Sequence, residues 1–342
     1  MKILITGGLG FIGINAAKYL ANLGHSVIVL DNLSRKGNIE NYNILKKYNN
    51  ISFYNIDLRN NFDLINIFQN CNFDVILHLA AQVAVTTSVT NPRIDFEINC
   101  IGTFNLLESY RTYCPNAILL YASTNKVYGE FELNEITETD TRYSVINFNG
   151  INEKQPLDFH SPYGCSKGSG DQYVIDYARI YGLKTVSLRQ SCIYGTNQFG
   201  IEDQGWMSWF SIAALLDKPI TIYGSGKQVR DVLYINDLIE LYYQIILNIN
   251  KCAGKAYNIG GGINYTISLL ELINILKEKL NKNIIYNFTD WRPGDQKIYI
   301  SDIDKIYNDI SWKPTTPISN GIDQMLQWIE NNRNMFYELK II

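Results

Sequence analysis

Three glycines spaced three residues apart near the N-terminus point to one kind of fold. Gly7, Gly10 and Gly13 follow an apolar run, Lys2–Thr6, and precede a helical pattern. Glycine suits these positions because the backbone must turn tightly there and pass close to a pyrophosphate. The free N–H groups at the start of the following helix can bind that pyrophosphate. An ordinary glycine-rich turn gives the same pattern, so the neighbouring residues have to decide between the two.

The context favours a dinucleotide site. A second apolar run ends just before Asp31, which comes 18 residues after Gly13 (31 − 13). An acidic side chain at this place holds the ribose hydroxyls of adenosine and repels a 2′-phosphate, which favours NAD over NADP. Arg35 weakens that preference, because a nearby arginine can accommodate the extra phosphate. Asp57 follows the third apolar run, where it either lies with Leu58 at the adenine edge or caps the next helix.

Short apolar runs alternate with helical patterns through the first half, which is typical of βαβ units and a parallel sheet. Long helices are expected at Arg93–Tyr113 and Ser161–Tyr181, and Ser268 with Glu271 has the spacing of a capping box that starts a later helix. The polar segment 130–158 has little periodicity and is predicted to be a loop or flap over a site. The strands are expected at Lys2–Thr6, Ser26–Leu30, Ile51–Asn55, Val75–Leu79, Ala117–Ala122 and Thr185–Arg189.

We therefore predict a Rossmann-type, doubly wound parallel α/β sheet with a smaller, interleaved α/β domain towards the C-terminus that binds the substrate. The dinucleotide-binding domain is predicted to comprise residues 1–189 and 231–258. Residues 190–230 and 259–342 are predicted to form the substrate-binding domain.

Tyr163 and Lys167 lie four apart in the second long helical pattern, so they share one face of the helix. Tyrosine, with an ordinary pKa near 10, is a poor base at neutral pH. Lowering that pKa to near neutrality takes about 4 kcal/mol of preferential stabilisation of the phenolate, which the Lys167 ammonium and a positive nicotinamide ring could supply together. Thr124 lies at the carboxyl end of the fifth strand, where it could share a proton with Tyr163 and a substrate hydroxyl.

Composition excludes several classes of protein. The formal net charge of −3 gives no electrostatic footprint for nucleic acid or an anionic membrane, and no apolar stretch is long enough for a membrane span. The six cysteines form no Cys-x-x-Cys pair and are expected to be reduced thiols of a cytoplasmic protein. With only three scattered histidines, we expect no metal site. His78 is expected to be a satisfied core residue, and His160 to cap a backbone group.

Longer motifs carry a resemblance over almost the whole chain. They are the glycine pattern, the pair Arg230–Asp231, the segment Arg292–Asp295, and the stretches DNLSRKG (31–37), HLAAQVA (78–84), STNKVYG (123–129), DFHSPYGCSKG (158–168) and GKQVRD (226–231). In these motifs the chain resembles the extended short-chain dehydrogenase/reductase family that acts on nucleotide-sugars. Within that family it is most similar to the branch that epimerises CDP-sugars at C2.

The resemblance implies a site residue by residue. Thr124, Tyr163 and Lys167 would be catalytic. The NAD contacts implied are Gly7, Gly10, Phe11, Ile12, Gly13, Asp31, Asn32, Ser34, Arg35, Asp57, Leu58, Leu79, Ala80, Ala81, Gln82, Asn99, Tyr163 and Lys167. The nucleotide-sugar would be bound by Thr86, Thr124, Asn125, Gln204, Gly205, Tyr223, Arg230, Arg292 and Asp295. The resemblance also implies a homodimer or homotetramer packed through the two long helices, and a role in making surface-polysaccharide precursors.

Two positions bear on the reaction. Sugar 4,6-dehydratases of this family carry an Asp-Glu pair after the catalytic threonine, because eliminating water needs its own acid and base. Asn125 and Lys126 stand there in this chain, which disfavours dehydration. Cys192 stands where many UDP-sugar enzymes of the family carry an asparagine. This difference predicts other contacts to the nucleotide-sugar. A C2 epimerase of CDP-sugars is our main hypothesis; the same reaction on CDP-glucose, a C4 epimerase of UDP-sugars, and a non-catalytic dinucleotide sensor are alternatives.

The second half supplies the candidate anchors for the nucleotide. Arg230 is a candidate diphosphate clamp, and Arg292 with Asp295 could bracket a phosphate and a ribose. For both arginines the alternative is a surface ion pair. The aromatic stretch around Trp206 and Trp209 could line a sugar or base pocket, or it could pack in the core.

Overall fold

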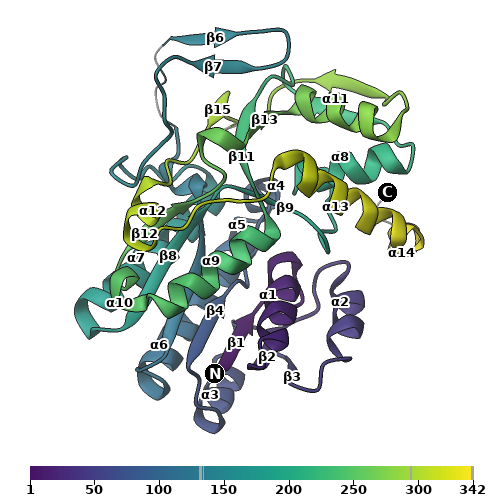
Figure 1. The fold of residues 1–342 in the computed structure, drawn as a ribbon. Coiled ribbons are helices and arrows are strands. Elements are labelled where there is room, and N and C mark those ends of the chain that lie inside the picture. Colours follow the sequence, from purple (N-terminus) through teal and green to yellow (C-terminus); the bar gives the residue numbers. More distant parts are fainter. Residues whose placement is uncertain (131–132, 134, 293–294, 340–342) are drawn as a thin grey trace.

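The computed structural model describes residues 1–130, 133, 135–292 and 295–339. Pro293 and Gly294 of the Arg292–Asp295 motif lie outside the described residues, as do positions 131, 132 and 134 of the predicted flap. Two lobes are visible in Figure 1, one built on a large parallel sheet and the other on several short strands and helices.

The larger lobe is the predicted doubly wound sheet. Its seven strands lie in the order β12-β8-β5-β4-β1-β2-β3 and all pair in parallel. The six strands predicted from the sequence are confirmed, with ends that differ by at most two residues. The strands are β1 (Lys2–Thr6), β2 (Ser26–Asp31), β3 (Ile51–Asn55), β4 (Val75–His78), β5 (Ile118–Thr124), β8 (Lys184–Gln190) and β12 (Ala256–Ile259).

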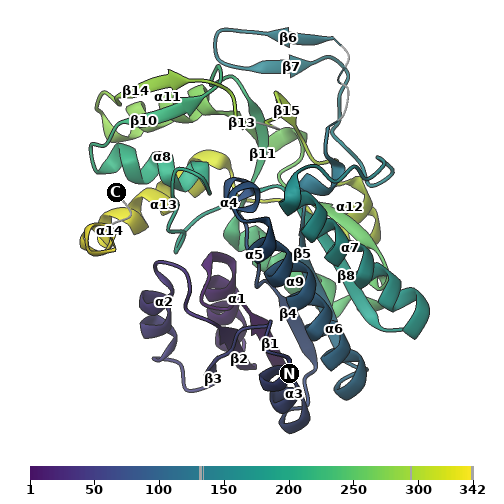
Figure 2. The same cartoon turned by 180° about the vertical axis from the view of Figure 1, so that it is seen from behind.

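Helices cover both faces of this sheet (Figures 1 and 2). One apolar core contains Ile14, Leu20 and Leu238 from the helices on one face, and a second contains Leu64, Leu107 and Val174 from those on the other. The first layer comprises α1 (Phe11–Asn22), α9 (Ile235–Leu247) and α10 (Ile249–Cys252), with α2 (Asn38–Leu45) beside it. The second comprises α3 (Asn61–Asn70), α4 (Val85–Thr90), α5 (Pro92–Phe96), α6 (Gly102–Tyr113) and α7 (Ser161–Tyr181).

The predicted helix at Arg93–Tyr113 is not one regular helix. Helices α5 and α6 are joined by a π-helical turn, Glu97–Ile101, in which the backbone keeps right-handed helical angles. A π turn contains one more residue than an α turn, so it changes the directions of the side chains that follow, and it often occurs at functional sites. Sequence periodicity does not reveal a single inserted residue. The helix Ser161–Tyr181 has the predicted bounds.

The smaller lobe begins where the chain leaves β8 and enters β9 (Cys192–Tyr194). Strand β11 (Val229–Tyr234) pairs with β9 and with β13 and β15 there, whereas the following α9, α10 and β12 return to the large lobe. The other elements of the smaller lobe are α8 (Trp206–Leu215), β10 (Ile220–Tyr223), β13 (Thr266–Ser268), α11 (Leu269–Leu280), β14 (Tyr286–Thr289), β15 (Ile298–Tyr299), α13 (Ile318–Asn331) and α14 (Arg333–Glu338), with a 3-10 turn at Ile263–Tyr265. Helix α12 (Asp304–Ile310) packs against β12 and α10 of the large lobe.

Two local predictions can be checked in this region. The capping box is confirmed, since the Ser268 hydroxyl accepts from the Glu271 N–H at 3.0 Å and the Glu271 carboxylate accepts from the Ser268 N–H at 2.9 Å. The segment 130–158 is not wholly irregular, because β6 (Ile136–Glu138) and β7 (Tyr143–Val145) form a hairpin. A hydrogen bond from the Tyr143 N–H to the Lys227 carbonyl holds this hairpin on the smaller lobe.

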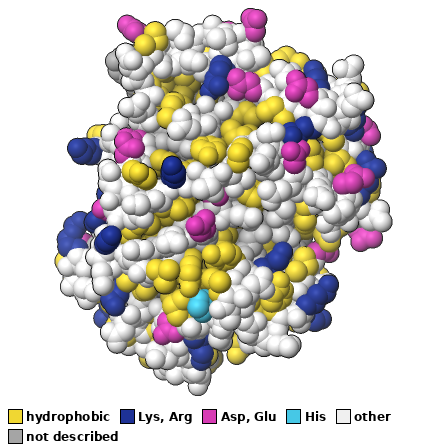
Figure 3. Space-filling model, viewed as in Figure 1, with side chains coloured by type: hydrophobic (Ala, Val, Ile, Leu, Met, Phe, Trp, Pro, Cys, Tyr) yellow, Lys and Arg dark blue, Asp and Glu magenta, His cyan; other side chains and the backbone are white. Residues whose placement is uncertain are grey.

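Acidic and basic side chains are intermixed on the face shown in Figure 3, in keeping with the small net charge. Among the described residues, no helix has the length and apolar character needed to cross a membrane.

The order of the strands fixes where a ligand binds. Strand β1 lies between β2 and β4, so the chain winds outward in both directions from this point. Open parallel sheets bind ligands in the crevice at the carboxyl ends of such strands. The candidate site therefore lies at the ends of β1, β2, β4 and β5, facing the smaller lobe.

Candidate active site

The glycine turn has the close backbone approaches that a dinucleotide cradle needs. Gly7 has φ +65°, and a Cβ there would lie 2.7 Å from the Ala80 backbone nitrogen. A Cβ on Gly13 would lie 2.4 Å from the Gly7 carbonyl oxygen. Gly10 is the N-cap of α1 and has no side chain to satisfy the first N–H groups of that helix. These N–H groups can therefore bind an anion such as a pyrophosphate, and the residues fit the predicted cofactor.

Asp31 is the last residue of β2 and is buried. Its Oδ1 accepts hydrogen bonds from the Leu33 N–H at 2.9 Å and the Asn38 amide at 2.8 Å, and its Oδ2 accepts from the Leu9 N–H at 3.2 Å. A carboxylate offers about four acceptor sites, so Oδ2 can take one further hydrogen bond, as from a ribose hydroxyl. Burial raises the pKa of Asp31, while these donors oppose that rise.

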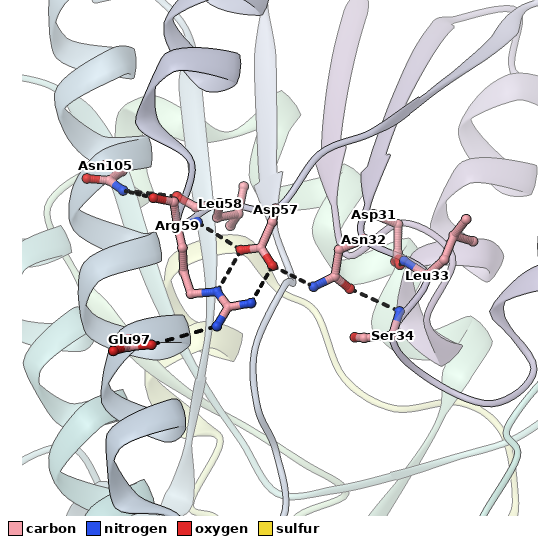
Figure 4. A network of polar contacts seen from close by, with 9 residues as sticks. All are labelled: Asp31, Asn32, Leu33, Ser34, Asp57, Leu58, Arg59, Glu97 and Asn105. Atoms are coloured by element: carbon pink, nitrogen blue, oxygen red, sulfur yellow. Dashed lines mark hydrogen bonds and ion pairs between the residues drawn. The ribbon is translucent and has the colours of Figure 1, made fainter.

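Asp57 lies after β3 with its carboxylate already saturated (Figure 4). It accepts hydrogen bonds from the Arg59 N–H, from the Arg59 guanidinium at 2.9 and 2.7 Å, and from the Asn32 amide at 2.9 Å. These contacts hold the pKa of Asp57 well below its ordinary value. The alternative role as a helix cap is wrong, because the side chain of Asn60 caps α3. A contact with adenine stays a prediction, and Asp57 would have to exchange a present partner to make it.

Tyr163, Lys167 and Thr124 come together at the carboxyl end of β5, and all three are buried. The Tyr163 phenol lies near the side chain of Thr124, the last residue of β5, which lowers the pKa of the phenol. One turn along α7, the Lys167 Nζ lies 4.2 Å from the centre of the Tyr121 ring. The arrangement places a phenol beside a hydroxyl, with Lys167 one turn further along the same helix.

Burial dominates the pKa values of these groups. It lowers the pKa of Lys167 to about 7, against the attraction of Asp171, Asp95 and Cys100. It raises the pKa of Tyr163 to about 12, and Asp95 raises it further, while Thr124 and Arg35 lower it. The prediction that the Lys167 ammonium depresses the pKa of Tyr163 is therefore not met by the protein alone. A phenolate at neutral pH requires positive charge beyond that of the chain.

A buried polar network lies behind Tyr163 and Lys167. The Asp95 carboxylate accepts from the Ser166 hydroxyl at 2.5 Å, from the Gln82 amide at 2.7 Å and from the Asn99 amide at 3.2 Å. Asn99 is in the π turn, and its Oδ1 accepts from the Gln82 N–H at 2.9 Å. The network joins the loop after β4 to the π turn and to α7.

The predicted substrate residues lie on the smaller lobe and on the edge of the large lobe that faces it, and both arginines form ion pairs. Asp295 pairs with Arg230 at 2.6 Å and not with Arg292. Arg292 instead pairs with Asp203 at 3.0 Å, and its guanidinium lies 3.8 Å from the centre of the Tyr223 ring. The Arg230–Asp295 pair is largely buried rather than at the surface.

Other predicted residues bridge the lobes or line the end of β5. Arg35 donates a hydrogen bond to the Gln204 side chain, which links the loop after β2 to the smaller lobe. Gly205 is the N-cap of α8 and has φ +74°. The Asn125 amide oxygen accepts from the Thr124 hydroxyl at 3.3 Å, and Thr86 lies partly buried on α4. The roles of these residues at a substrate stay predictions.

The remaining predicted cofactor residues follow the same edge of the sheet. Phe11 and Ile12 begin α1, Asn32 and Ser34 follow β2, and Leu58 follows β3. The loop after β4 carries Leu79, Ala80, Ala81 and Gln82.

The structure also bears on the roles predicted for two tryptophans and two histidines. Trp206 and Trp209 pack against the apolar core, as core packing predicted, and Trp206 also hydrogen-bonds Cys192. His78 is fully buried between the Thr6 and Thr103 hydroxyls, both at 2.9 Å, and burial lowers its pKa to about 3. The expectation of a satisfied core residue is confirmed.

The expectation for His160 is wrong. Its side chain does not cap α7, although His160 is the N-cap residue, because Nε2 lies 2.8 Å from the Asp158 carboxylate.

Sequence reasoning missed three residues of this region. Asp95 and Ser166 form the buried network, and Lys126 lies partly buried at the end of β5 within electrostatic reach of Arg230 and Asp295. Ser166 lies inside the Tyr163–Lys167 motif, and Asp95 lies four residues before Asn99, so both had a local signal.

Comparison with known proteins places the chain among enzymes of nucleotide-sugar metabolism. The family model described as GDP-mannose 4,6 dehydratase matches residues 4–325. A CDP-paratose 2-epimerase of Salmonella typhi is 47% identical over 334 residues, covering 96% of this chain and 99% of that protein. A dTDP-glucose 4,6-dehydratase of Escherichia coli is 32% identical over 356 residues, covering 99% of this chain and 96% of that protein.

A solved structure extends the likeness to three dimensions. UDP-glucuronic acid 4-epimerase from Bacillus cereus, in complex with UDP-glucuronic acid and NAD, matches with a TM-score of 0.84 and 28% identity. The match covers 97% of this chain and 99% of that one.

Proposed function

Because the chain belongs to the GDP-mannose 4,6-dehydratase family of extended short-chain dehydrogenases/reductases, we propose that it converts CDP-paratose to CDP-tyvelose as an NAD-dependent nucleotide-sugar 2-epimerase. NAD is the cofactor, in keeping with the glycine turn, the uncapped start of α1 and the spare acceptor on Asp31. The observation that supports the substrate best is the end-to-end likeness to the Salmonella enzyme.

The chain's own residues move the proton. Tyr163 takes the proton of the sugar C2 hydroxyl and later returns one to the C2 oxygen, with Thr124 hydrogen-bonded to both oxygens. Lys167, whose Nζ lies over the Tyr121 ring, is proposed to bind the nicotinamide ribose. When bound, NAD would supply a hydride acceptor for C2 and a hydride donor for the opposite face of the keto sugar. Between the two transfers the sugar turns while its nucleotide stays anchored.

The smaller lobe supplies that anchor. Arg230 is held by Asp295, and Arg292 lies against the Tyr223 ring, so two guanidinium groups are fixed on this side of the crevice. Guanidinium groups bind phosphate oxygens in a bidentate manner and stack on planar rings. We propose that Arg230 binds the diphosphate and that Arg292 brackets the nucleoside.

Epimerisation is favoured over dehydration by the residues after Thr124. Elimination of water requires an additional carboxylate pair, and Asn125 and Lys126 offer none. Lys126 is partly buried, and burial together with Arg230 lowers its pKa while Asp295 opposes that change.

A substrate panel in deuterated water tests both the substrate and the mechanism. We expect CDP-paratose to yield CDP-tyvelose, observed by NMR as inversion at C2, with no deuterium at that carbon because the hydride is returned. CDP-glucose and UDP-glucose are the comparison substrates. Inversion of CDP-glucose at C2 or of a UDP-sugar at C4, with CDP-paratose inert, would move the assignment to that substrate. Deuterium at C2 would show that the enzyme abstracts a proton at this carbon and does not return a hydride. NAD binding without any turnover would indicate a non-catalytic sensor.

We also propose a homo-oligomer that packs through α6 and α7, which lie side by side on the sheet face shown in Figure 2. This surface leaves Phe104 41% and Ile180 62% exposed, together with Tyr173 at 47%. Apolar side chains gathered on two adjacent helices are typical of a subunit interface.

Light scattering should give at least twice the 39.2 kDa of one chain. Ile180→Lys should reduce that mass, since it places a charge in the packed surface. Ile285→Lys, an equally exposed apolar site in the smaller lobe, is the control and should leave the mass unchanged. A wild-type mass of one chain would contradict the proposal.

The enzyme is proposed to act in the cytoplasm on precursors of surface polysaccharides. All six cysteines are free thiols, which suits a reducing compartment.

A further inference from the structure

Asp95 is a buried carboxylate with no direct part in the chemistry above. It is fully inaccessible to solvent and lies on the short helix α5. Within the described part of the chain, no lysine, arginine or histidine nitrogen lies within 4 Å of its oxygens. Burying a charge is costly unless the charge is paired or well hydrogen-bonded. A carboxylate kept at such a position therefore calls for a reason.

Hydrogen bonding alone does not require the charge. The Gln82 and Asn99 amides both donate to Asp95 Oδ1, which an asparagine side chain at this position would also offer. Only the Ser166 hydroxyl donates to Oδ2, at 2.5 Å, and a hydroxyl can reverse its role and accept instead. An asparagine would satisfy the same partners without the cost of desolvating a carboxylate.

The partners of Asp95 connect it to the cofactor and to the catalytic helix. Gln82 and Asn99 are two of the predicted NAD contacts, and they also hold each other through the Gln82 N–H and carbonyl at 2.9 and 3.0 Å. Ser166 directly precedes Lys167 on α7. The Cys100 thiol of the π turn contacts the Ser166 carbonyl at 3.5 Å, so the π turn and α7 are joined a second time.

We propose that Asp95 is a positioning residue of the active site, whose carboxylate fixes Gln82, Asn99 and Ser166 and holds a negative charge behind Tyr163 and Lys167. Asn99, which lies in the π turn four residues after Asp95, donates to this carboxylate at 3.2 Å. The charge stabilises the protonated Lys167 and opposes premature ionisation of Tyr163.

Several groups other than Asp95 also face Tyr163 and Lys167 and contribute to their pKa values. Lys167 is faced by Asp171 on its own helix, Cys100 on the π turn, His78 on β4 and the Tyr121 ring on β5. Tyr163 is faced by Thr124 on β5 and by Arg35 from the loop after β2. Asp95 raises the pKa of both Lys167 and Tyr163. Removing its charge should therefore lower both values together.

The test uses three variants of the full-length enzyme, and its activity arm rests on the proposed function. In Asp95→Asn, both limbs of the pH profile of kcat/KM should move to lower pH by about half a unit or more, the scale of a nearby charge. Both limbs move in the same direction because Tyr163 and Lys167 each lose a proton more easily once the Asp95 charge is gone. Ser166→Ala is the charge-preserving control. It removes the hydroxyl that donates to Asp95, accepts from the Asn99 amide at 3.0 Å and lies 3.2 Å from the Tyr163 carbonyl, but it keeps the carboxylate, so both limbs should stay at the wild-type pH values.

The second arm needs no sugar. In Asp95→Ala, Gln82 and Asn99 lose their common acceptor, and we expect bound NAD to dissociate at least about tenfold faster than from the wild type, as followed by dilution and filtration. Asp95→Asn, which keeps an acceptor, should retain NAD near the wild-type rate. Thermal unfolding identifies any variant that fails to fold. If Asp95→Ala fails to fold, the comparison of Asp95→Asn with Ser166→Ala decides the test.

Each result has one meaning. Unmoved limbs in Asp95→Asn would overturn the electrostatic role, and wild-type NAD dissociation from a folded Asp95→Ala would overturn the positioning role. If the wild type turned over no nucleotide-sugar, the proposed function would fail, whereas the NAD arm would still test Asp95.

Discussion

Tyr163→Phe should lower turnover by about 10²–10⁴-fold, the usual contribution of a positioned acid or base. The substitution removes only the hydroxyl that lies near Thr124, so no group remains to take the proton of the sugar alcohol. The aromatic ring stays in its buried place on α7, and the glycine turn and Asp31 are untouched. NAD should therefore remain bound. Turnover is measured by NMR of the sugar product, and NAD by extraction from the purified variant.

Tyr110→Phe is the matched control, because Tyr110 is another buried tyrosine, and its hydroxyl donates to the Ala117 carbonyl at 2.8 Å. It lies on α6 away from the catalytic groups, and its loss should cost about 1 kcal/mol of stability with turnover unchanged. If Tyr163→Phe stayed within a few-fold of this control, a different group would be the base.

The sheet could be predicted because its signals are local. Runs such as Lys2–Thr6 and Ile51–Asn55 are short and mostly apolar, with glycine or a polar residue at one boundary, and the structure gives the same bounds. The helix Ser161–Tyr181 was equally clear, since proline follows at its first turn and glycine ends it. The π turn at Glu97–Ile101 was not, because one extra residue shifts the periodicity less than the normal scatter of side chains.

Within the candidate site, only contacts between residues that are close in the sequence could be predicted. Tyr163 and Lys167 are one helical turn apart, whereas Arg230 and Asp295 are separated by 65 positions and meet only through packing of the smaller lobe. The sequence predicted only that Arg292 and Asp295, which are close in the chain, could bracket a phosphate and a ribose together. Folding instead places Arg292 against Tyr223 and Asp203, which belong to β10 and the loop before α8.

The pKa of Tyr163 shows a further limit of reasoning from spacing. Four residues along a helix bring Lys167 to the same face, but burial moves both groups towards their neutral forms. Desolvation depends on everything packed around a side chain, so a local sequence motif does not reveal it. The buried Asp95, which acts on both groups, comes from a different helix.

Gly13→Ala should leave the enzyme without bound NAD. A Cβ at this position would lie 2.4 Å from the Gly7 carbonyl oxygen and 2.5 Å from the Gly8 Cα, distances that no real Cβ tolerates. Both neighbours are backbone atoms of the turn itself, so relief requires the turn to move away from α1. That movement displaces the N–H groups that face the pyrophosphate. We expect bound NAD to fall by at least about tenfold and stability by about 1–3 kcal/mol, as for other overpacked sites.

Gly24→Ala separates the loss of NAD from the loss of stability. Gly24 lies just beyond the other end of the same helix with φ +82°, and a Cβ there would meet no atom within 4 Å. Its substitution should cost about 1–2 kcal/mol through backbone strain alone. Two variants of similar stability would then differ in NAD content, measured by extraction and by the thermal shift on adding NAD. If Gly13→Ala kept its NAD as Gly24→Ala does, the pyrophosphate would have to bind elsewhere, because no arrangement of this turn accommodates both a side chain and the present backbone.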